Sequence, residues 1–135
     1  MLGVEKNRVI TPQLRQILKQ SIYEFADSLD SDICDLIAVI GPCISKSKYE
    51  VKKDFLIKFT KKNKKNRLFF YFRKKKIFFS LNRYIKNQLK DIGVKNIEII
   101  NKDTYLTKNN FFSYRRSLKN KYYDYGRNIS VIMIK

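Results

Sequence analysis

The side chains of this sequence that are best suited to hold a ligand lie in two short segments near its C-terminal end. The candidate substrate-binding residues are Ser113, Tyr114, Arg115, Arg116 and Arg127. Arginine presents a planar fork of donors that binds phosphate or carboxylate at two points, an adjacent aromatic ring can stack on a flat ligand, and a serine hydroxyl adds a hydrogen bond. The alternative is structural: Phe111, Phe112 and the tyrosine pack in the core, and the arginines pair with acids. Both interpretations stay open for the arginines.

Other residues that commonly perform catalysis are scarce. The chain contains no histidine, which removes the usual proton shuttle at neutral pH and the commonest ligand for zinc or copper. No HExxH, CxxC, GxSxG or phosphate-loop motif occurs. Cys34 and Cys43 are expected to be small buried hydrophobic residues. We therefore expect no catalytic residue, no metal site and no cofactor within this chain.

The net charge is strongly positive. Thirty basic residues stand against twelve acidic ones, giving +18. From Phe55 to Lys90 there are 13 lysines and arginines and no acid. Such a field attracts nucleic acid or an anionic surface, but a drift toward lysine in A/T-rich codons gives the same bias on a merely solvated surface. A small basic RNA-binding module, built on Leu68 to Phe79, is the alternative function.

The sequence also bears on localisation. Residues 1–10 contain Glu5, Lys6 and Arg8, which interrupt any apolar signal-peptide core. No stretch reaches the roughly 18 apolar residues needed to cross a bilayer. Two cysteines are too few for a disulfide framework. We expect a cytoplasmic protein without a membrane partner.

Periodic patterns predict a mixture of helices and strands. Thr11-Pro12 resembles a helix start, and an apolar stripe follows before Asp30-Ser31-Asp32. The stripe consists of Leu14, Ile17, Leu18, Ile22, Phe25 and Leu29. A short helix over Val51 to Phe59 places Phe55, Leu56 and Phe59 on one side. A second long helix is expected over Ser80 to Ile92, with Gly93 as its cap.

Strands are expected between these helices. Leu36 to Ile40 is a continuous apolar run that ends at Gly41-Pro42 and indicates a buried strand. Leu68 to Phe72 and Ile77 to Phe79 form a hairpin with a basic turn. Asn96 to Ile100 and Ile129 to Ile134 are further strands. The composition and the lack of an internal repeat favour one compact unit.

Four segments in this order resemble one family. They are Ala38-Val39-Ile40-Gly41-Pro42-Cys43-Ile44, Tyr49-Glu50-Val51, Gly93-Val94-Lys95-Asn96-Ile97, and Phe111-Phe112-Ser113-Tyr114-Arg115-Arg116 followed by Gly126-Arg127. The chain resembles the C-terminal half of the YfiH or laccase-domain family. Its members are described as purine nucleoside phosphorylases of adenosine and inosine with related deaminase activity, and earlier as multicopper polyphenol oxidases or peptidoglycan editing factors. The resemblance implies an α+β fold, a mixed β-sheet covered by helices, with residues 1–135 as a single partial domain.

The resemblance also implies what this sequence lacks. Family members place zinc-binding and catalytic His, Cys and His around VHG, ADC and HAGWRG segments in their N-terminal half, and none of these occurs here. Three departures lie in the matching part: Ser45-Lys46 replaces a second GP, Asp103 stands where a cysteine commonly precedes Thr-Tyr, and Ser117 to Tyr125 replaces a short turn. We expect a truncated phosphorylase that is inactive alone.

Two partners follow as expectations from that interpretation. A separately encoded N-terminal half is the first, and purine nucleoside and phosphate bind only in the reconstituted enzyme. Nucleic acid is the second, with weak and non-specific binding through the basic residues. The zinc or copper of full-length family members is expected to lie outside this chain.

Overall fold

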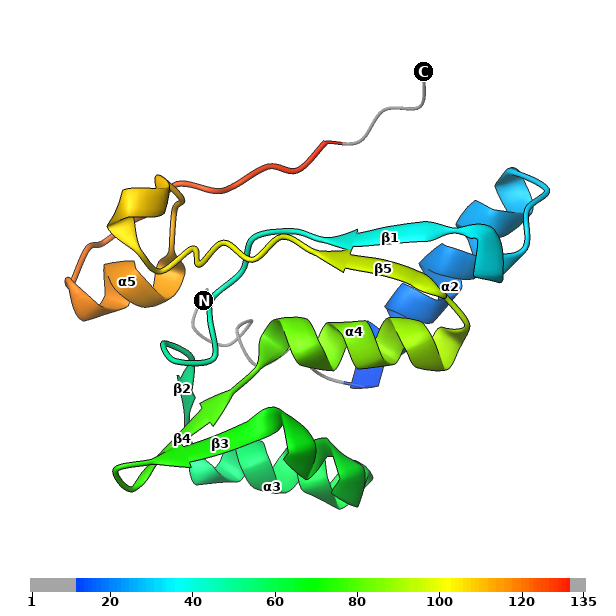
Figure 1. The fold of residues 1–135 in the computed structure, drawn as a ribbon. Coiled ribbons are helices and arrows are strands. Elements are labelled where there is room, and N and C mark those ends of the chain that lie inside the picture. The colour runs from blue at the N-terminus through cyan, green and yellow to red at the C-terminus, as the bar shows by residue number, and fades with distance from the viewer. Residues whose placement is uncertain (1–11, 132–135) are drawn as a thin grey trace. The chain divides into compact units, whose positions relative to one another are not determined.

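The computed structural model describes residues 12–131 of the chain (Figure 1). The fold is α+β, as expected, and its residue contacts divide it into two compact units. Unit 1 comprises residues 1–39 and 85–98, and unit 2 comprises residues 40–84 and 99–135. The expectation of a single partial domain stays a prediction, and each unit is described separately.

Unit 1 is built from two helical segments and a small sheet. Helix α2 spans Pro12–Ser28, and the chain leaves it through Asp30 at φ 50°, where Ser31 N–H donates to the Ala26 carbonyl at 3.0 Å. The predicted helix is confirmed, although its Thr11 cap and Leu14 side chain lie outside what the structure describes. Ala26 is buried, whereas Ile17 and Phe25 are exposed. The apolar stripe is therefore only partly covered.

The strands β1, Ile37–Ile40, and β5, Asn96–Ile99, pair in a two-stranded sheet. Their arrows run in the same direction (Figure 1), so the pair is parallel. The prediction that β1 is buried was wrong: Ile37 is 70% and Val39 50% exposed. Alternate strand residues point to opposite faces, and within residues 12–131 the covered face is the one with Ile40.

Helix α4 spans Leu81–Ile92, as predicted, and ends at Gly93. Gly93 adopts φ 116°, a conformation that residues with a Cβ rarely adopt. Its N–H donates to the Lys90 carbonyl at 3.0 Å, and Val94 N–H donates to the Leu89 carbonyl at 3.1 Å. These bonds satisfy carbonyls at the helix end, so the predicted glycine cap is confirmed.

Unit 2 contains a three-stranded antiparallel sheet in the order β2-β4-β3. Strand β2 is Glu50–Val51, β3 is Phe70–Arg73 and β4 is Lys76–Phe79. The β3–β4 hairpin was predicted, and its turn uses Lys74 and Lys75 at φ 47° and 61°. Positive φ at both turn positions matches the twist of a two-residue hairpin, here without glycine or asparagine. Strand β2 was not predicted, because two residues carry no periodic signal.

The core of unit 2 is aromatic. Phe79 of β4 is 0% exposed. Its ring centroid lies 4.9 Å from that of Phe70, 5.3 Å from those of Phe55 and Phe59, and 5.6 Å from that of Tyr84. Fully burying such a ring stabilises a fold by about 1.5–3 kcal/mol. Helix α3, Lys53–Lys62, supplies the predicted buried face of Phe55, Leu56 and Phe59.

The remaining elements of the described chain are short. Three 3-10 segments occur, η1 at Ile33–Asp35, η2 at Lys64–Phe69 and η3 at Thr107–Asn109, and helix α5 spans Tyr114–Lys119. The strand predicted over Ile129 to Ile134 is absent from residues 129–131, whose backbone is irregular, and residues 132–134 lie outside the description. Ile129 and Val131 are exposed because nothing described pairs with them.

Candidate functional site

The two C-terminal motif segments lie against each other in unit 2. Phe112 N–H donates to Asn128 Oδ1 at 2.9 Å, and Asn128 Nδ2 donates to the Phe112 carbonyl at 2.8 Å. Between them, a Cβ on Gly126 would lie 2.5 Å from carbons of the Phe112 ring. The ring is 53% exposed, so it packs on this glycine rather than in the core. The core role expected for Phe112 is therefore wrong.

Ser113 begins helix α5. Its buried Oγ accepts the Arg116 N–H at 3.3 Å, and its carbonyl accepts the Ser117 N–H at 2.9 Å. A serine side chain commonly satisfies one of the free N–H groups at a helix start. The hydroxyl that was expected to contact substrate thus has a capping partner.

The guanidinium of Arg116 holds a loop in place. Its Nη1 donates to the carbonyls of Thr104 and Tyr105 at 3.1 and 2.9 Å, and its Nη2 donates to that of Phe111 at 2.6 Å. These carbonyls have no partner in a helix or strand, and a buried carbonyl without a partner costs free energy. Arg116 therefore fastens residues 104–111 to helix α5. It pairs with no acid among the described residues.

Arg115 and Arg127 each donate a single hydrogen bond within the described chain. Arg115 Nη1 donates to the Glu50 carbonyl of β2 at 2.7 Å, and its guanidinium lies 5.2 Å from the centre of the Tyr49 ring. Arg127 Nη1 donates to the Tyr125 carbonyl at 2.6 Å, with its guanidinium 4.0 Å from that tyrosine's ring. Neither pairs with an acid there, so the expected acid pairing is wrong for all three arginines.

Aromatic rings accompany these arginines. The centres of the Tyr114 and Tyr125 rings lie 4.8 Å apart with the ring planes tilted by 56°, and the Arg127 guanidinium lies over the Tyr125 ring. Arg115 lies over a different ring, that of Tyr49. Burial raises the pKa of Tyr49 above its usual value, and the positive charge of Arg115 partly opposes this shift. We name Tyr114, Tyr125 and Arg127, together with Arg115, which follows Tyr114 in helix α5 and contacts Tyr49 and Glu50, the arginine–tyrosine cluster.

A second polar centre, which the sequence patterns did not reveal, is built on Asp103. Its carboxylate accepts the Ser45 hydroxyl at 2.5 Å, the Ser45 N–H at 3.2 Å and the Tyr105 N–H at 2.8 Å. Residue 103 was noted only as a departure from the family pattern, and its partner Ser45 lies 58 positions earlier in the sequence. The sequence offered one signal for this contact: Ser45 and Asp103 both depart from the family pattern, and the two departures occur together.

Cys43 lies beside this centre. It forms a parallel bridge with Asp103, and its carbonyl accepts the Thr104 N–H at 3.2 Å. Burial, and next the negative charge of Asp103, raise the pKa of the Cys43 thiol. A neutral thiol is a poor nucleophile. Cys34 and Cys43 are half-buried rather than fully buried as expected.

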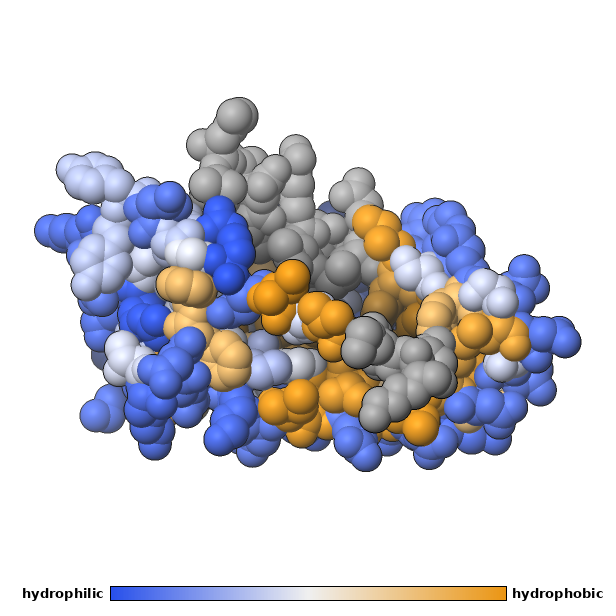
Figure 2. Space-filling model, turned by 90° about the horizontal axis from the view of Figure 1, so that it is seen from above, coloured by the Kyte–Doolittle hydropathy of each residue, from blue (hydrophilic) through white to orange (hydrophobic). Residues whose placement is uncertain are grey.

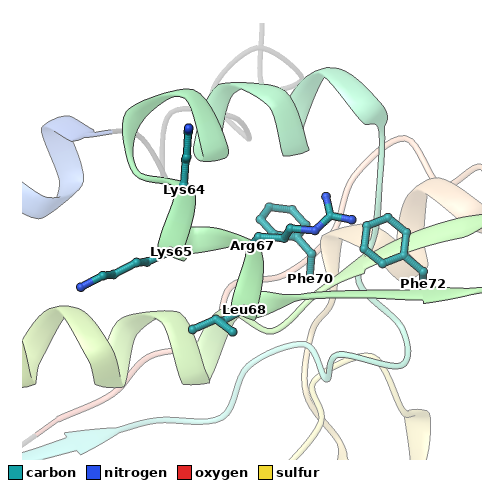
Figure 3. Close-up of a pocket in the computed structure, with 6 residues that line it drawn as sticks. All are labelled: Lys64, Lys65, Arg67, Leu68, Phe70 and Phe72. Atoms are coloured by element: carbon teal, nitrogen blue, oxygen red, sulfur yellow. The ribbon is translucent and has the colours of Figure 1, made fainter.

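An open basic hollow lies on unit 2. It has a volume of about 740 Å³ and is lined by Lys64, Lys65, Arg67, Leu68, Phe70 and Phe72. The Arg67 guanidinium lies between the rings of Phe70 and Phe72 (Figure 3), 5.1 Å from the centre of the latter. Leu68 is 68% and Phe72 54% exposed. Leu68, Phe70 and Phe72 belong to the Leu68 to Phe79 segment from which the sequence suggested an RNA-binding module.

The fold and the motif order define a laccase-domain type of α+β protein. A family model described as multi-copper polyphenol oxidoreductase laccase matches residues 12–135, and the chain belongs to this family. A purine nucleoside phosphorylase of Rickettsia conorii is 39% identical over 85 residues, which are 62% of this chain and 35% of that relative. One of Rickettsia prowazekii is 35% identical over 103 residues, which are 75% of this chain and 43% of the relative. The expected family is thus confirmed, and the chain aligns with less than half of either relative.

The family description implies copper, and the donor set of this chain does not fit it. Copper sites use imidazole and soft sulfur ligands, and the sequence has no histidine. Within the described residues, Asp32, Cys34 and Asp35 place their ligand atoms within 4.8 Å of one another. The two exposed carboxylates of this group are hard oxygen ligands, and the one thiol is its single soft ligand, so the group does not fit copper.

No helix of the described chain is long and apolar enough to cross a membrane.

Proposed function

We propose that this chain forms the C-terminal part of a purine nucleoside phosphorylase, which cleaves adenosine or inosine with phosphate to the free base and ribose 1-phosphate. The related deaminase activity belongs to the same proposal. The observation that carries it is the pairing of Phe112 with Asn128, which brings the Phe111–Arg116 segment of the family pattern beside the Gly126-Arg127 that follows it. The curated relatives that bear the phosphorylase name support it.

Within this proposal the candidate residues divide into two roles. Ser113 and Arg116 are positioning residues, because their polar groups bind backbone within the fold. Arg115 and Arg127 contact substrate, because each uses only Nη1 in a hydrogen bond within the described chain and retains further donors of its guanidinium fork. Tyr114 lies beside Tyr125 and offers a ring for the purine face.

The chemistry of base departure requires groups that these 135 residues do not contain. Phosphorolysis needs an anchored phosphate, a purine held by its edges and stabilisation of the leaving base. The arginine–tyrosine cluster supplies part of the first two requirements. The family resemblance places zinc-binding and catalytic His and Cys residues in an N-terminal half, and this chain has no histidine. We propose that turnover requires this half in addition to the residues of this chain.

Arginine variants in a reconstituted enzyme test this division of roles. The chain is co-expressed with the part of the R. conorii relative that precedes the aligned region, and release of hypoxanthine from inosine is followed in phosphate buffer. Arg115→Ala and Arg127→Ala should raise KM for phosphate about tenfold or more, since a charged hydrogen bond is worth about 1.5–3 kcal/mol. Arg73→Ala is the matched control, an exposed arginine outside the cluster. An unchanged KM in both cluster variants contradicts the proposed substrate contacts.

Non-specific binding of single-stranded RNA is the second candidate function. The basic hollow favours it, because Lys64, Lys65 and Arg67 stand beside exposed Leu68 and Phe72. Cationic side chains contact the phosphates, and aromatic rings stack on any base.

A further inference from the structure

Tyr71 of strand β3 is in contact with two cationic side chains that no acid pairs with in the described chain. The Lys46 Nζ lies 4.5 Å from the centre of the Tyr71 ring, and Arg83 Nη1 donates to the Tyr71 hydroxyl oxygen at 2.8 Å. Neither cation forms an ion pair among residues 12–131. Like charges brought to one ring repel each other, and an anion placed between them removes this cost. The pair is therefore a candidate site for an anion.

The two cations project from backbone that the fold of unit 2 holds in place. Lys46 lies in a turn that begins at Ser45, whose carbonyl accepts the Lys48 N–H at 3.0 Å. Asp103 anchors this turn, because its carboxylate accepts the hydroxyl and the N–H of Ser45 at 2.5 and 3.2 Å. Arg83 lies in the first turn of helix α4, whose N-terminal end adds partial positive charge. A site formed before its ligand arrives binds at a lower entropy cost.

A single exposed cation marks no site on a chain with a net charge of +18, and Figure 2 shows hydrophilic side chains widely spread over the face that it draws. Tyr71 differs because a lysine and an arginine meet at one ring. Tyr105, by comparison, has a lysine alone among the described residues, with Lys48 Nζ 5.7 Å from its ring centre. Glu50 lies in the same cross-strand row as Tyr71, but its carboxylate binds Lys76 at 2.9 Å. The cations at Tyr71 thus lack a counter-ion within the described chain.

We propose that Lys46, Tyr71 and Arg83 bind a phosphate dianion, either free phosphate or the monoester of a small molecule such as a nucleotide. Near pH 7 a phosphate monoester carries a charge of about −1.5 to −2, which matches the two cations. The Arg83 guanidinium keeps donors beyond Nη1 for contact with two phosphate oxygens, and the ammonium supplies a point charge. The tyrosine hydroxyl, which accepts from Arg83, donates its own hydrogen to a third oxygen.

This site is separate from the two already described. Tyr71 projects to the face of the sheet opposite to Phe70 and Phe72 of the basic hollow, because neighbouring strand residues point to opposite faces. Glu50, whose carbonyl accepts a hydrogen bond from Arg115, lies two strands from Tyr71, about 10 Å at the usual strand spacing. The inference therefore goes beyond the proposed phosphorolysis and does not depend on it.

Calorimetric titration of the full chain tests the site. The probes are inorganic phosphate and adenosine 5′-monophosphate, with adenosine as the control ligand, at about 0.15 M salt, where exposed charges more than about 8 Å apart are largely screened. We expect both phosphates to bind at one site and adenosine not to bind there. Equal affinity for the two assigns recognition to the phosphate group alone, and tighter binding of the nucleotide assigns a monoester as the ligand.

Tyr71→Phe is the decisive variant, because it removes one hydroxyl and leaves the net charge unchanged. It should lower the affinity for phosphate about threefold or more. Arg83→Gln should lower it about tenfold or more, because a charged donor is lost. Tyr105→Phe is the matched control, the same change at a tyrosine that also has a lysine over its ring, and should leave the affinity unchanged. Urea unfolding of each variant shows that it is folded.

Three results overturn the proposal. The first is a wild-type chain that binds neither phosphate, or equal effects of Tyr71→Phe and Tyr105→Phe. The second is a loss of phosphate affinity in Arg115→Ala and not in Arg83→Gln, which places the bound phosphate in the arginine–tyrosine cluster. The third is tighter binding of a single-stranded RNA without terminal phosphates that Tyr71→Phe weakens, since the site then recognises phosphodiesters.

Discussion

The side chain of Asn128 pairs with both backbone groups of Phe112, accepting its N–H at 2.9 Å and donating to its carbonyl at 2.8 Å. This arrangement imitates one rung of a β-ladder with a side chain in place of a strand. It holds residues 126–128 beside the start of helix α5, where the Phe112 ring packs against Gly126.

Gly126→Ala should therefore destabilise the protein. The added Cβ would lie 2.5–2.6 Å from three ring carbons of Phe112, and overpacking of this kind costs about 1–3 kcal/mol. Urea unfolding measures the loss. The double variant with Phe112→Ala should recover most of it, since the clashing ring is gone; a double variant no more stable than Gly126→Ala would show that the contact is not the cause.

The three arginines should differ in their effect on stability. Arg116→Ala removes three hydrogen bonds to loop carbonyls and should lower the free energy of unfolding by about 2 kcal/mol or more. Arg127→Ala removes one bond to the nearby Tyr125 carbonyl and should cost less than about 1 kcal/mol. Urea unfolding of both variants decides it, and equal losses would contradict the positioning role of Arg116.

Cys43 should react slowly with iodoacetamide and respond to its neighbour. Its raised pKa keeps less thiolate at a given pH than an ordinary cysteine has, and the charge of Asp103 contributes to that shift. Asp103→Asn should lower the pKa and speed alkylation of Cys43 at pH 8, with Cys34 in the same sample as the reference read by mass spectrometry. Slower alkylation of Cys43 in Asp103→Asn would contradict this electrostatic effect.

The same shift has a sign for stability. The folded thiol has a higher pKa than the unfolded one, so the folded state binds more protons between the two values. The stability contribution of this cysteine is complete below the unfolded pKa and falls as pH rises through the folded one. Wild type should thus lose more free energy of unfolding above about pH 9 than Cys43→Ala does.

RNA binding, if it uses the basic hollow, should be weak and strongly dependent on salt. The combined change of Lys64, Lys65 and Arg67 to Gln should weaken binding of a labelled single strand and flatten the salt dependence, with a slope change of about 0.7 per lost phosphate contact. The matched control changes Lys95, Lys102 and Lys108, all exposed, and alters the net charge equally. Equal effects would assign binding to net charge rather than to the hollow.

Local signals in the sequence predicted the long elements well. Helix α4 was predicted with its end at Gly93, because the apolar period and the glycine cap agree. The hairpin was predicted from two aromatic runs, although Lys74 and Lys75 make its turn at positive φ. The burial of β1 was predicted wrongly. A continuous apolar run indicates that both faces of a strand favour contact with other elements, but it does not show whether such elements lie against them.

The site was harder to predict, because its residues act through backbone groups distant in sequence. The arginine segment was identified, but the bonds of Arg116 to the carbonyls of residues 104, 105 and 111 were not. Those acceptors exist at every residue and leave no mark in a sequence. The hydrogen bond between Ser45 and Asp103 was equally hard to predict, because serine and aspartate are common residue types. Only the fold brings Ser45 Oγ within 2.5 Å of Asp103 Oδ2.

We propose that this chain is part of a nucleoside phosphorylase whose turnover also needs the part of the family domain that lies outside the aligned region of the relatives. The most direct measurement is the release of hypoxanthine from inosine in phosphate buffer, with the chain alone and with the co-expressed segment of the R. conorii relative, in preparations free of host phosphorylase. We expect no release above background from the chain alone and phosphate-dependent release from the pair. Robust turnover by the chain alone, or none by a stable pair, would contradict the account.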